Sequence, residues 1–198
     1  MAASPMFPLG SVLFPFVPIP LRVFEPRYLT MVGRLLDEDE PEFGVVLIER
    51  GPEAGGGDQR ASVGTMARLV SAAARADDLL IIAVGTRRVT VERWVDDDPY
   101  PQAELSTLPD LEWSEELAPL RTEAEAVVRR VIARVADPDS DADIELADDP
   151  VAAVWQLAAI APLGEYDRYT LLRSTSMGGL LRQLIDLTIE AEELWSAE

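Results

Sequence analysis

The apolar and polar positions follow two different rhythms in the two halves of the chain. From Met6 to about Asp110, short apolar runs alternate with turn residues, a pattern typical of strands. Two long strands, 63–75 and 79–94, are expected on either side of a tight turn at Asp77-Asp78. The other elements predicted in this half are strands at 12–16, 19–24, 43–49 and 101–108 and an amphipathic helix at 26–36.

Beyond Pro109 the apolar residues recur at helical spacing. This pattern predicts helices at 114–136, 150–160, 164–172 and 177–195. Ser114, Asp149 and Ser176 stand where side chains cap the first turn of such helices. We therefore expect an α+β protein in two parts, a β domain over residues 6–110 and a helical subdomain over residues 111–198.

An apolar segment near the start of the chain is interrupted by prolines. Within residues 7–28 these are Pro8, Pro15, Pro18, Pro20 and Pro26. Each proline fixes φ and removes a backbone donor, so no long regular strand or helix can pass through the segment. Such a segment is typical of short extended pieces that turn corners in a small closed β structure.

The composition removes several kinds of chemistry. The chain has 198 residues, no His and no Cys, and all 17 of its basic residues are Arg. The usual general base, the thiolate nucleophile and the Schiff-base amine are therefore missing, as is the lysine of a phosphate-binding P-loop. The residues predict no catalytic group and no cofactor, and binding is favoured over catalysis.

Charge and hydropathy narrow the partners. The net charge of −19 would repel phosphate backbones and anionic membrane surfaces, so neither nucleic acid nor membrane is an expected partner. No apolar run approaches the roughly 20 residues of a membrane span. The first residues lack the charge and apolar core of a secretory signal, and a cytoplasmic location is expected.

Three blocks of sequence, in the same order and spacing, carry a family resemblance. They are residues 7–28, ending in Phe24-Glu25-Pro26-Arg27-Tyr28, then Val63-Gly64-Thr65-Met66-Ala67-Arg68, and then Gly85-Thr86-Arg87-Arg88-Val89. Together with the helical tail around Trp155-Gln156-Leu157-Ala158, they resemble the amino-terminal substrate-binding domain of Lon proteases, in its stand-alone form.

The resemblance implies a PUA-like β pseudo-barrel followed by a helical bundle. It implies a non-catalytic module that binds polypeptide segments of unfolded or tagged proteins, as an adaptor or chaperone-like factor in protein quality control. An ATP-dependent protease is then a candidate partner. From the length and the missing lysine, we expect no counterpart of the ATPase and Ser-Lys peptidase of full Lon enzymes in these 198 residues.

Seven residues are candidates for contact with a bound peptide: Phe14, Phe16, Arg22, Phe24, Glu25, Arg27 and Arg88. The aromatic residues would line a groove for an extended apolar segment, or alternatively fill the barrel. The arginines would recognise a carboxylate or a peptide carbonyl through their planar donors. Alternatively, Glu25 pairs with a neighbouring arginine where the helix begins.

An acidic run offers a weak candidate for a metal site. Asp137, Asp139, Asp141 and Asp148 fall at positions 1, 3, 5 and 12 of a calcium loop. Position 6, which needs glycine, is Ala142, and position 12 is not glutamate. A solvated connection between helices is the stronger interpretation.

Two other functions remain open. A small-molecule sensor would hold its ligand in the mouth of the barrel. A carboxylate-dependent hydrolase would use acidic residues such as Glu25, Glu49, Asp77 and Asp78, although no paired spacing singles them out.

Overall fold

The contacts of the chain fall into two units, Met1–Asp110 and Leu111–Glu198. The structure is a computed structural model, and it describes residues 3–51, 59–95, 97–135 and 144–196. Each unit is described by itself.

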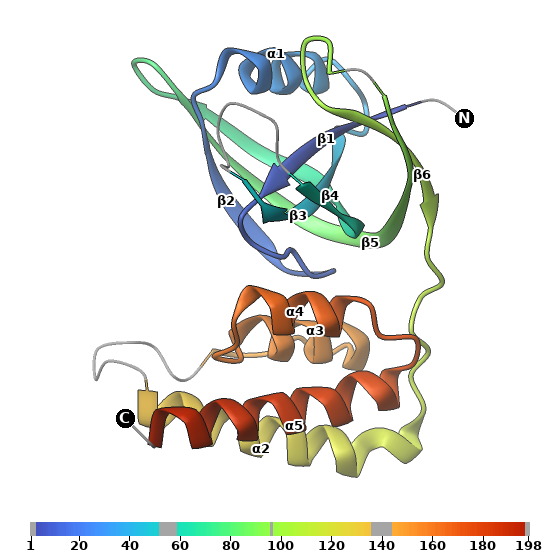
Figure 1. Ribbon diagram of the computed structural model, residues 1–198, viewed down its shortest axis with the longest axis vertical. Helices are drawn as coiled ribbons and strands as arrows, with labels where there is room; N and C mark the ends of the chain where they lie inside the picture. Colours follow the sequence, from blue (N-terminus) through green and yellow to red (C-terminus); the bar gives the residue numbers. More distant parts are fainter. Residues whose placement is uncertain (1–2, 52–58, 96, 136–143, 197–198) are drawn as a thin grey trace. The chain divides into compact units, whose positions relative to one another are not determined.

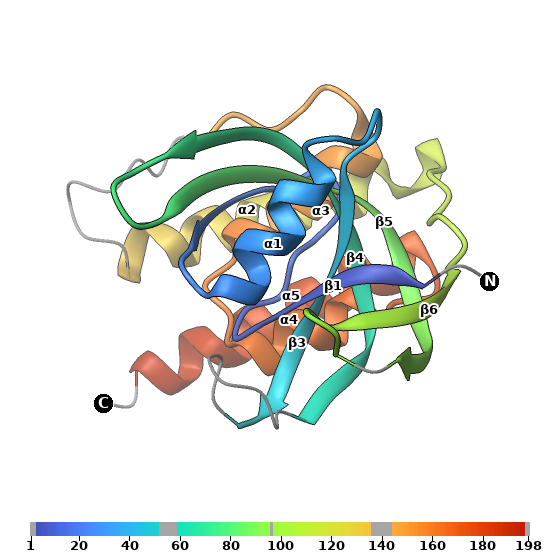
Figure 2. The same ribbon diagram turned by 90° about the horizontal axis from the view of Figure 1, so that it is seen from above.

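The first unit is built from six strands that close on themselves (Figures 1 and 2). The strands are β1 (Ser4–Leu9), β2 (Pro18–Val23), β3 (Glu42–Arg50), β4 (Gln59–Ala74), β5 (Leu79–Val95) and β6 (Gln102–Thr107). Their order is β2-β5-β4-β3-β1-β6, and β6 also pairs with β5. The pair β1–β3 is parallel and the other pairs are antiparallel.

The length of β5 allows this closure. Its first part, Leu79 to Val84, pairs with β2, whereas its second part, from Val89 to Val95, pairs with β6. The ring β1-β3-β4-β5-β6 is therefore closed, and β2 occupies the rest of the same edge of β5. Within the described residues, no strand pairs with the other side of β2.

The predicted strand at 12–16 is wrong. The structure has no regular element there, and the first strand is β1, a few residues earlier. Leu13 and Phe14 are 3% and 1% exposed, which explains why the run looked like a buried strand. Both residues belong to a buried loop that ends at Phe16. The φ of Phe16 is 62°, which is incompatible with a strand.

The helix α1 (Pro26–Leu35) completes the core of the first unit. It begins at Pro26, whose missing N–H costs nothing at the first helical position. Its buried residues Tyr28, Met31, Val32 and Leu35 pack with inward-facing residues of the strands in one apolar cluster. The helix thereby fixes the chain that leaves β2.

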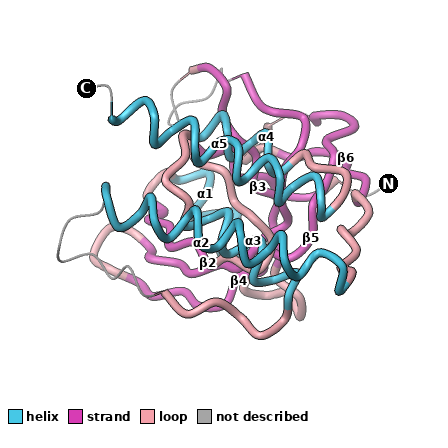
Figure 3. Tube along the Cα trace, turned by 90° about the horizontal axis from the view of Figure 1, so that it is seen from below, coloured by secondary structure: helices cyan, strands magenta, loops and turns pink. Residues whose placement is uncertain are grey.

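The second unit is helical. It comprises a short 3-10 turn (Glu115–Leu117), α2 (Ala118–Val135), α3 (Pro150–Ile160), α4 (Glu165–Leu172) and α5 (Met177–Ser196). The helices α2 and α5 lie side by side (Figure 3), and both Arg130 and Arg134 form ion pairs with Glu192 between them. None of the described helices is both long and apolar enough to cross a membrane.

The predicted helix caps are confirmed. The carboxylate of Asp149 accepts a hydrogen bond from the amide of Ala152 at 2.8 Å. The hydroxyl of Ser176 accepts one from the amide of Gly179 at 3.1 Å. Ser114 accepts a longer one, of 3.4 Å, before the 3-10 turn. Each cap satisfies a donor that has no partner inside its helix.

Candidate functional site

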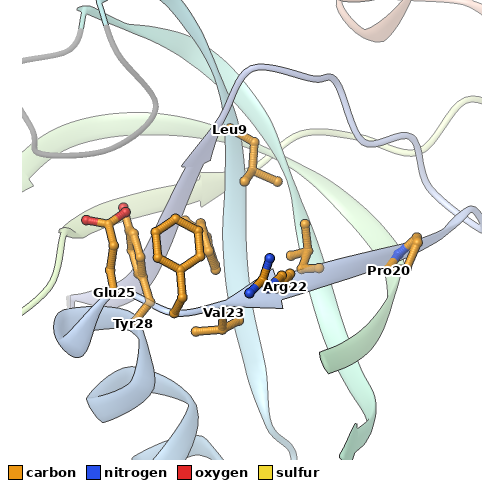
Figure 4. Close-up of a pocket in the computed structure, with 9 residues that line it drawn as sticks. Leu9, Pro20, Arg22, Val23, Glu25 and Tyr28 are labelled. Carbon is orange, nitrogen blue, oxygen red and sulfur yellow. The ribbon is translucent and has the colours of Figure 1, made fainter. Parts of the chain in front are cut away.

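A pocket lies in the first unit where β2 leads into α1 (Figure 4). It has a volume of about 250 Å³. The residues labelled in the figure are Leu9, Pro20, Arg22, Val23, Glu25 and Tyr28, and Phe7, Leu21 and Phe24 complete the lining. Six of these nine side chains are aliphatic or aromatic residues other than proline, so the pocket is mainly apolar.

One side of the pocket is a fixed aromatic surface. Phe7 of β1 and Tyr28 of α1 stack with their ring centroids 4.0 Å apart and their planes at 11°. Both are buried, whereas Phe24, between β2 and α1, is 57% exposed. Phe24 is therefore a large apolar side chain that a ligand could cover without any rearrangement of the core.

The charged residues of the pocket are held in ion pairs. Arg22 pairs with the buried carboxylate of Asp78, yet 71% of the Arg22 side chain remains exposed. The Nε of Arg27 donates to Glu25 Oε2 at 3.1 Å, and the Arg27 guanidinium lies 4.6 Å from the centroid of the Tyr28 ring. The pairing of Glu25 with a neighbouring arginine, one of the two alternatives above, is thus what the structure contains.

The open side of β2 is poor in donors. Along an antiparallel strand, the backbone N–H and C=O groups of successive residues point alternately to one neighbouring strand and to the other. The amide of Gly85 in β5 donates to the carbonyl of Val17 at 3.0 Å, so the backbone groups of Val17 point to β5. Odd-numbered positions therefore face β5, and the even-numbered Pro18, Pro20 and Arg22 face away from it. Because proline has no N–H, only Arg22 offers an amide donor on the open side. This edge is unsuited to the addition of another strand.

Two of the predicted contact residues lie in the interior. Phe14 is 1% exposed and Arg88 is 5% exposed, so neither is available to a peptide at this surface. The Nη2 of Arg88 instead donates to the carbonyl of Pro109 at 2.7 Å. Burial lowers the pKa of Arg88 from its ordinary value, and the nearby charge of Asp110 opposes this shift. Arg88 therefore fastens the end of the first unit.

The remaining aromatic candidate lies outside the pocket lining. Phe16 is 42% exposed and ends the loop before β2. The pocket thus brings together Arg22, Phe24 and Glu25 of the predicted set, and Arg27 contacts it through Glu25. Phe7, Leu9 and Tyr28 were not predicted as lining, although they belong to the proline-rich segment that marked this region.

The described part of the chain contains no site for the calcium-loop hypothesis or for the carboxylate-dependent hydrolase. Asp137, Asp139 and Asp141 lie outside the described residues, and Asp148 is exposed. No group of three or more acidic residues within the described ranges could hold a metal ion. Of the acidic residues considered for hydrolysis, Asp78 and Glu25 are each engaged by an arginine.

Two sequence blocks anchor the loop that precedes the pocket. The buried hydroxyl of Thr65 donates to the carbonyl of Leu13 at 2.6 Å. A Cβ placed on Gly85 would lie 2.1 Å from the carbonyl oxygen of Phe14, so only glycine allows the loop to come this close. In the sequence, the order and spacing of these blocks indicated only the family resemblance. In the structure, they hold the loop in place.

Comparisons with known proteins agree with this architecture. The family model of the ATP-dependent protease La (LON) substrate-binding domain matches residues 3–189. The structure is similar to a Lon N-terminal domain protein from Xanthomonas campestris, with 30% identity, a TM-score of 0.66 and coverage of 94% of this chain and 98% of that one. It is also similar to the N-terminal domain of a Mycobacterium avium complex Lon protease, with 16% identity, a TM-score of 0.70 and coverage of 96% and 99%.

These findings place the chain among proteins with a closed β unit followed by helices, which confirms the predicted fold class. The chain belongs to the Lon substrate-binding domain family. No curated protein matches it.

Proposed function

We propose that this protein is a non-catalytic binding module for segments of unfolded or tagged polypeptides, acting as an adaptor or chaperone-like factor in protein quality control. Membership of a substrate-binding family supports the role. The observation that carries the proposal is the apolar pocket beside Phe24, which joins a buried aromatic surface to an exposed aromatic side chain.

The bound segment would insert a single apolar side chain into the pocket. Ligand sites for whole small molecules usually enclose roughly 300–1,000 Å³, so a pocket of about 250 Å³ is small for the sensor alternative. Strand addition along β2 is disfavoured because Pro18 and Pro20 remove two outward donors. Arg22 would then supply donors to a carbonyl or carboxylate of the segment.

The proposed location is the cytoplasm, and the proposed partners are polypeptides and an ATP-dependent protease that would receive them. Neither a nucleic acid nor a membrane is a proposed partner, since the net charge is −19. Co-purification from the native cytoplasm, followed by identification of the bound proteins, tests the partnership. Recovery of no ATP-dependent protease would contradict that part of the proposal.

Binding is tested by the fluorescence anisotropy of a labelled, unstructured apolar peptide titrated with the full chain. Burial of a phenylalanine side chain contributes about 1.5–3 kcal/mol, so Phe24→Ala should weaken binding about tenfold or more. Tyr166→Ala is a matched control, because Tyr166 is an aromatic residue of α4 that is 79% exposed and outside the pocket. Absence of saturable binding, or equal weakening by both variants, would overturn the proposal.

A further inference from the structure

The second unit has a pocket of different chemistry, where α4 ends and α5 begins. Its volume is about 480 Å³, and its polar lining includes Arg173, Thr175, Arg182 and Gln183. None of the described residues that line it is acidic. The chain as a whole has 36 acidic and 17 basic residues, so acidic residues outnumber basic ones about two to one.

The two arginines of this pocket have no carboxylate partner within the described residues. Elsewhere in the same unit, ion pairs engage Arg129, Arg130, Arg134 and Arg168. Two unpaired guanidinium groups on one concave surface raise the local positive potential, and an anion would lower the energy of both.

Local structure accounts for only one of these arginines. Arg173 is the C-cap of α4, where a cation interacts favourably with the helix dipole, and its guanidinium lies 5.6 Å from the centroid of the Tyr169 ring. Arg182 has no such role. It lies near the beginning of α5, and the first turn of that helix carries no acidic side chain to balance it.

The neutral side chains of the pocket add donors. The hydroxyl of Ser174 donates to Oε1 of Gln183 at 3.1 Å, which uses the amide oxygen of Gln183 and leaves its NH₂ group for the pocket. Thr175 contributes an exposed hydroxyl. A lining of guanidinium, amide N–H and hydroxyl groups without a carboxylate matches an oxyanion with several acceptor oxygens.

We propose that this pocket binds a phosphate group. Guanidinium groups present pairs of N–H donors in the geometry of phosphate oxygens. The volume lies within the range of sites for small organic molecules, so the phosphate is one carried by a small phosphorylated metabolite, and free phosphate would use the same donors. The inference concerns the second unit and does not depend on peptide binding by the first.

The test is isothermal titration calorimetry of the full chain with inorganic phosphate, glucose 6-phosphate and glucose. We expect saturable binding of inorganic phosphate and of glucose 6-phosphate, and no binding of glucose. Tighter binding of glucose 6-phosphate identifies an organic phosphate as the ligand class, and equal binding identifies free phosphate. No saturable heat with either at about 10 mM would overturn the proposal, since weaker sites lack physiological meaning.

Variants distinguish binding in the pocket from a general effect of the protein's charge. Arg182→Gln should weaken binding about tenfold or more, because hydrogen bonds to charged groups contribute about 1.5–3 kcal/mol. Arg182→Lys keeps the charge but loses the planar fork, and should recover part of the affinity. Arg121→Gln removes the same charge from α2, outside the pocket, and should leave binding unchanged. Equal weakening by Arg121→Gln and Arg182→Gln would refute a specific site.

Discussion

Replacement of Gly85 by alanine tests whether the loop before β2 is seated by a close backbone contact. The added Cβ would lie 2.1 Å from the carbonyl oxygen of Phe14 and 3.2 Å from Cγ2 of Thr65. The oxygen belongs to backbone and cannot rotate away. The loop must therefore move away from β5. This movement would break or lengthen the hydrogen bonds that join Gly85 to Phe16 and Val17, of 2.8 and 3.0 Å.

The expected cost follows from overpacking a dense interior. Such substitutions typically cost about 1–3 kcal/mol, and a rigid obstacle places Gly85→Ala at the upper end, about 3 kcal/mol. In a unit of this size each kcal/mol lowers Tm by roughly 4 °C or more, so Tm should fall by about 12 °C. Differential scanning calorimetry of the full chain measures the change, and it also separates the transitions of the two units if they unfold independently.

Gly33→Ala supplies the matched control in the same unit. Gly33 lies within α1, and a Cβ there would meet nothing within 4 Å. Alanine is the better helix former by about 0.5–1 kcal/mol, so this variant should be more stable than the natural chain. The same chemical change then has opposite effects at the two sites. If Gly85→Ala unfolds no earlier than Gly33→Ala, the close contact does not hold the loop.

Two further substitutions test hydrogen bonds by urea denaturation. Thr65→Val leaves the buried carbonyl of Leu13 without its donor and should cost about 1–3 kcal/mol; a cost no larger than that of Thr65→Ser, which keeps the hydroxyl, would count against this bond. Asp149→Ala removes the cap of α3 and should cost about 1 kcal/mol, whereas Asp149→Asn should retain most of the stability. Equal losses for the two Asp149 variants would argue against capping.

The helices of the second unit could be predicted because their signals are local. Asp149 followed by Pro150 marks the beginning of α3 by a cap and a proline at the first position, and both features depend on adjacent residues alone. The pairing of β4 with β5 was also predictable, since both strands are long and joined by a short turn at Asp77-Asp78.

The loop at 12–16 could not be predicted in the same way. Its residues are as apolar as those of a strand, and apolar runs alone do not distinguish a strand from a buried loop. What decides the conformation is distant in sequence, because Thr65 bonds to Leu13 and Gly85 accommodates Phe14. Such contacts become visible only once β4 and β5 are placed.

The candidate pocket was predictable in region and not in its members. Phe14 and Phe24 both stand beside prolines or charged residues in one apolar segment, yet their exposed fractions are 1% and 57%. Between them the side chains alternate between surface and interior, since Phe16 is 42% exposed and Val23, next to Phe24, is 1% exposed. The composition shows that aromatic residues are present in this segment, but the burial of each is set by the loop or strand that carries it.

The anchoring contacts and the pocket are therefore parts of one arrangement. Thr65 and Gly85 fix the loop, the loop sets the register of β2 against β5, and β2 carries Arg22 and leads into Phe24. A shift of one residue in this register would turn Leu21 and Val23 outward and move Pro20 against β5, where its missing N–H would break the pairing. The prolines thus exclude every register shifted by an odd number of residues, and they also remove donors from the open edge of β2. The position of the pocket follows from that register.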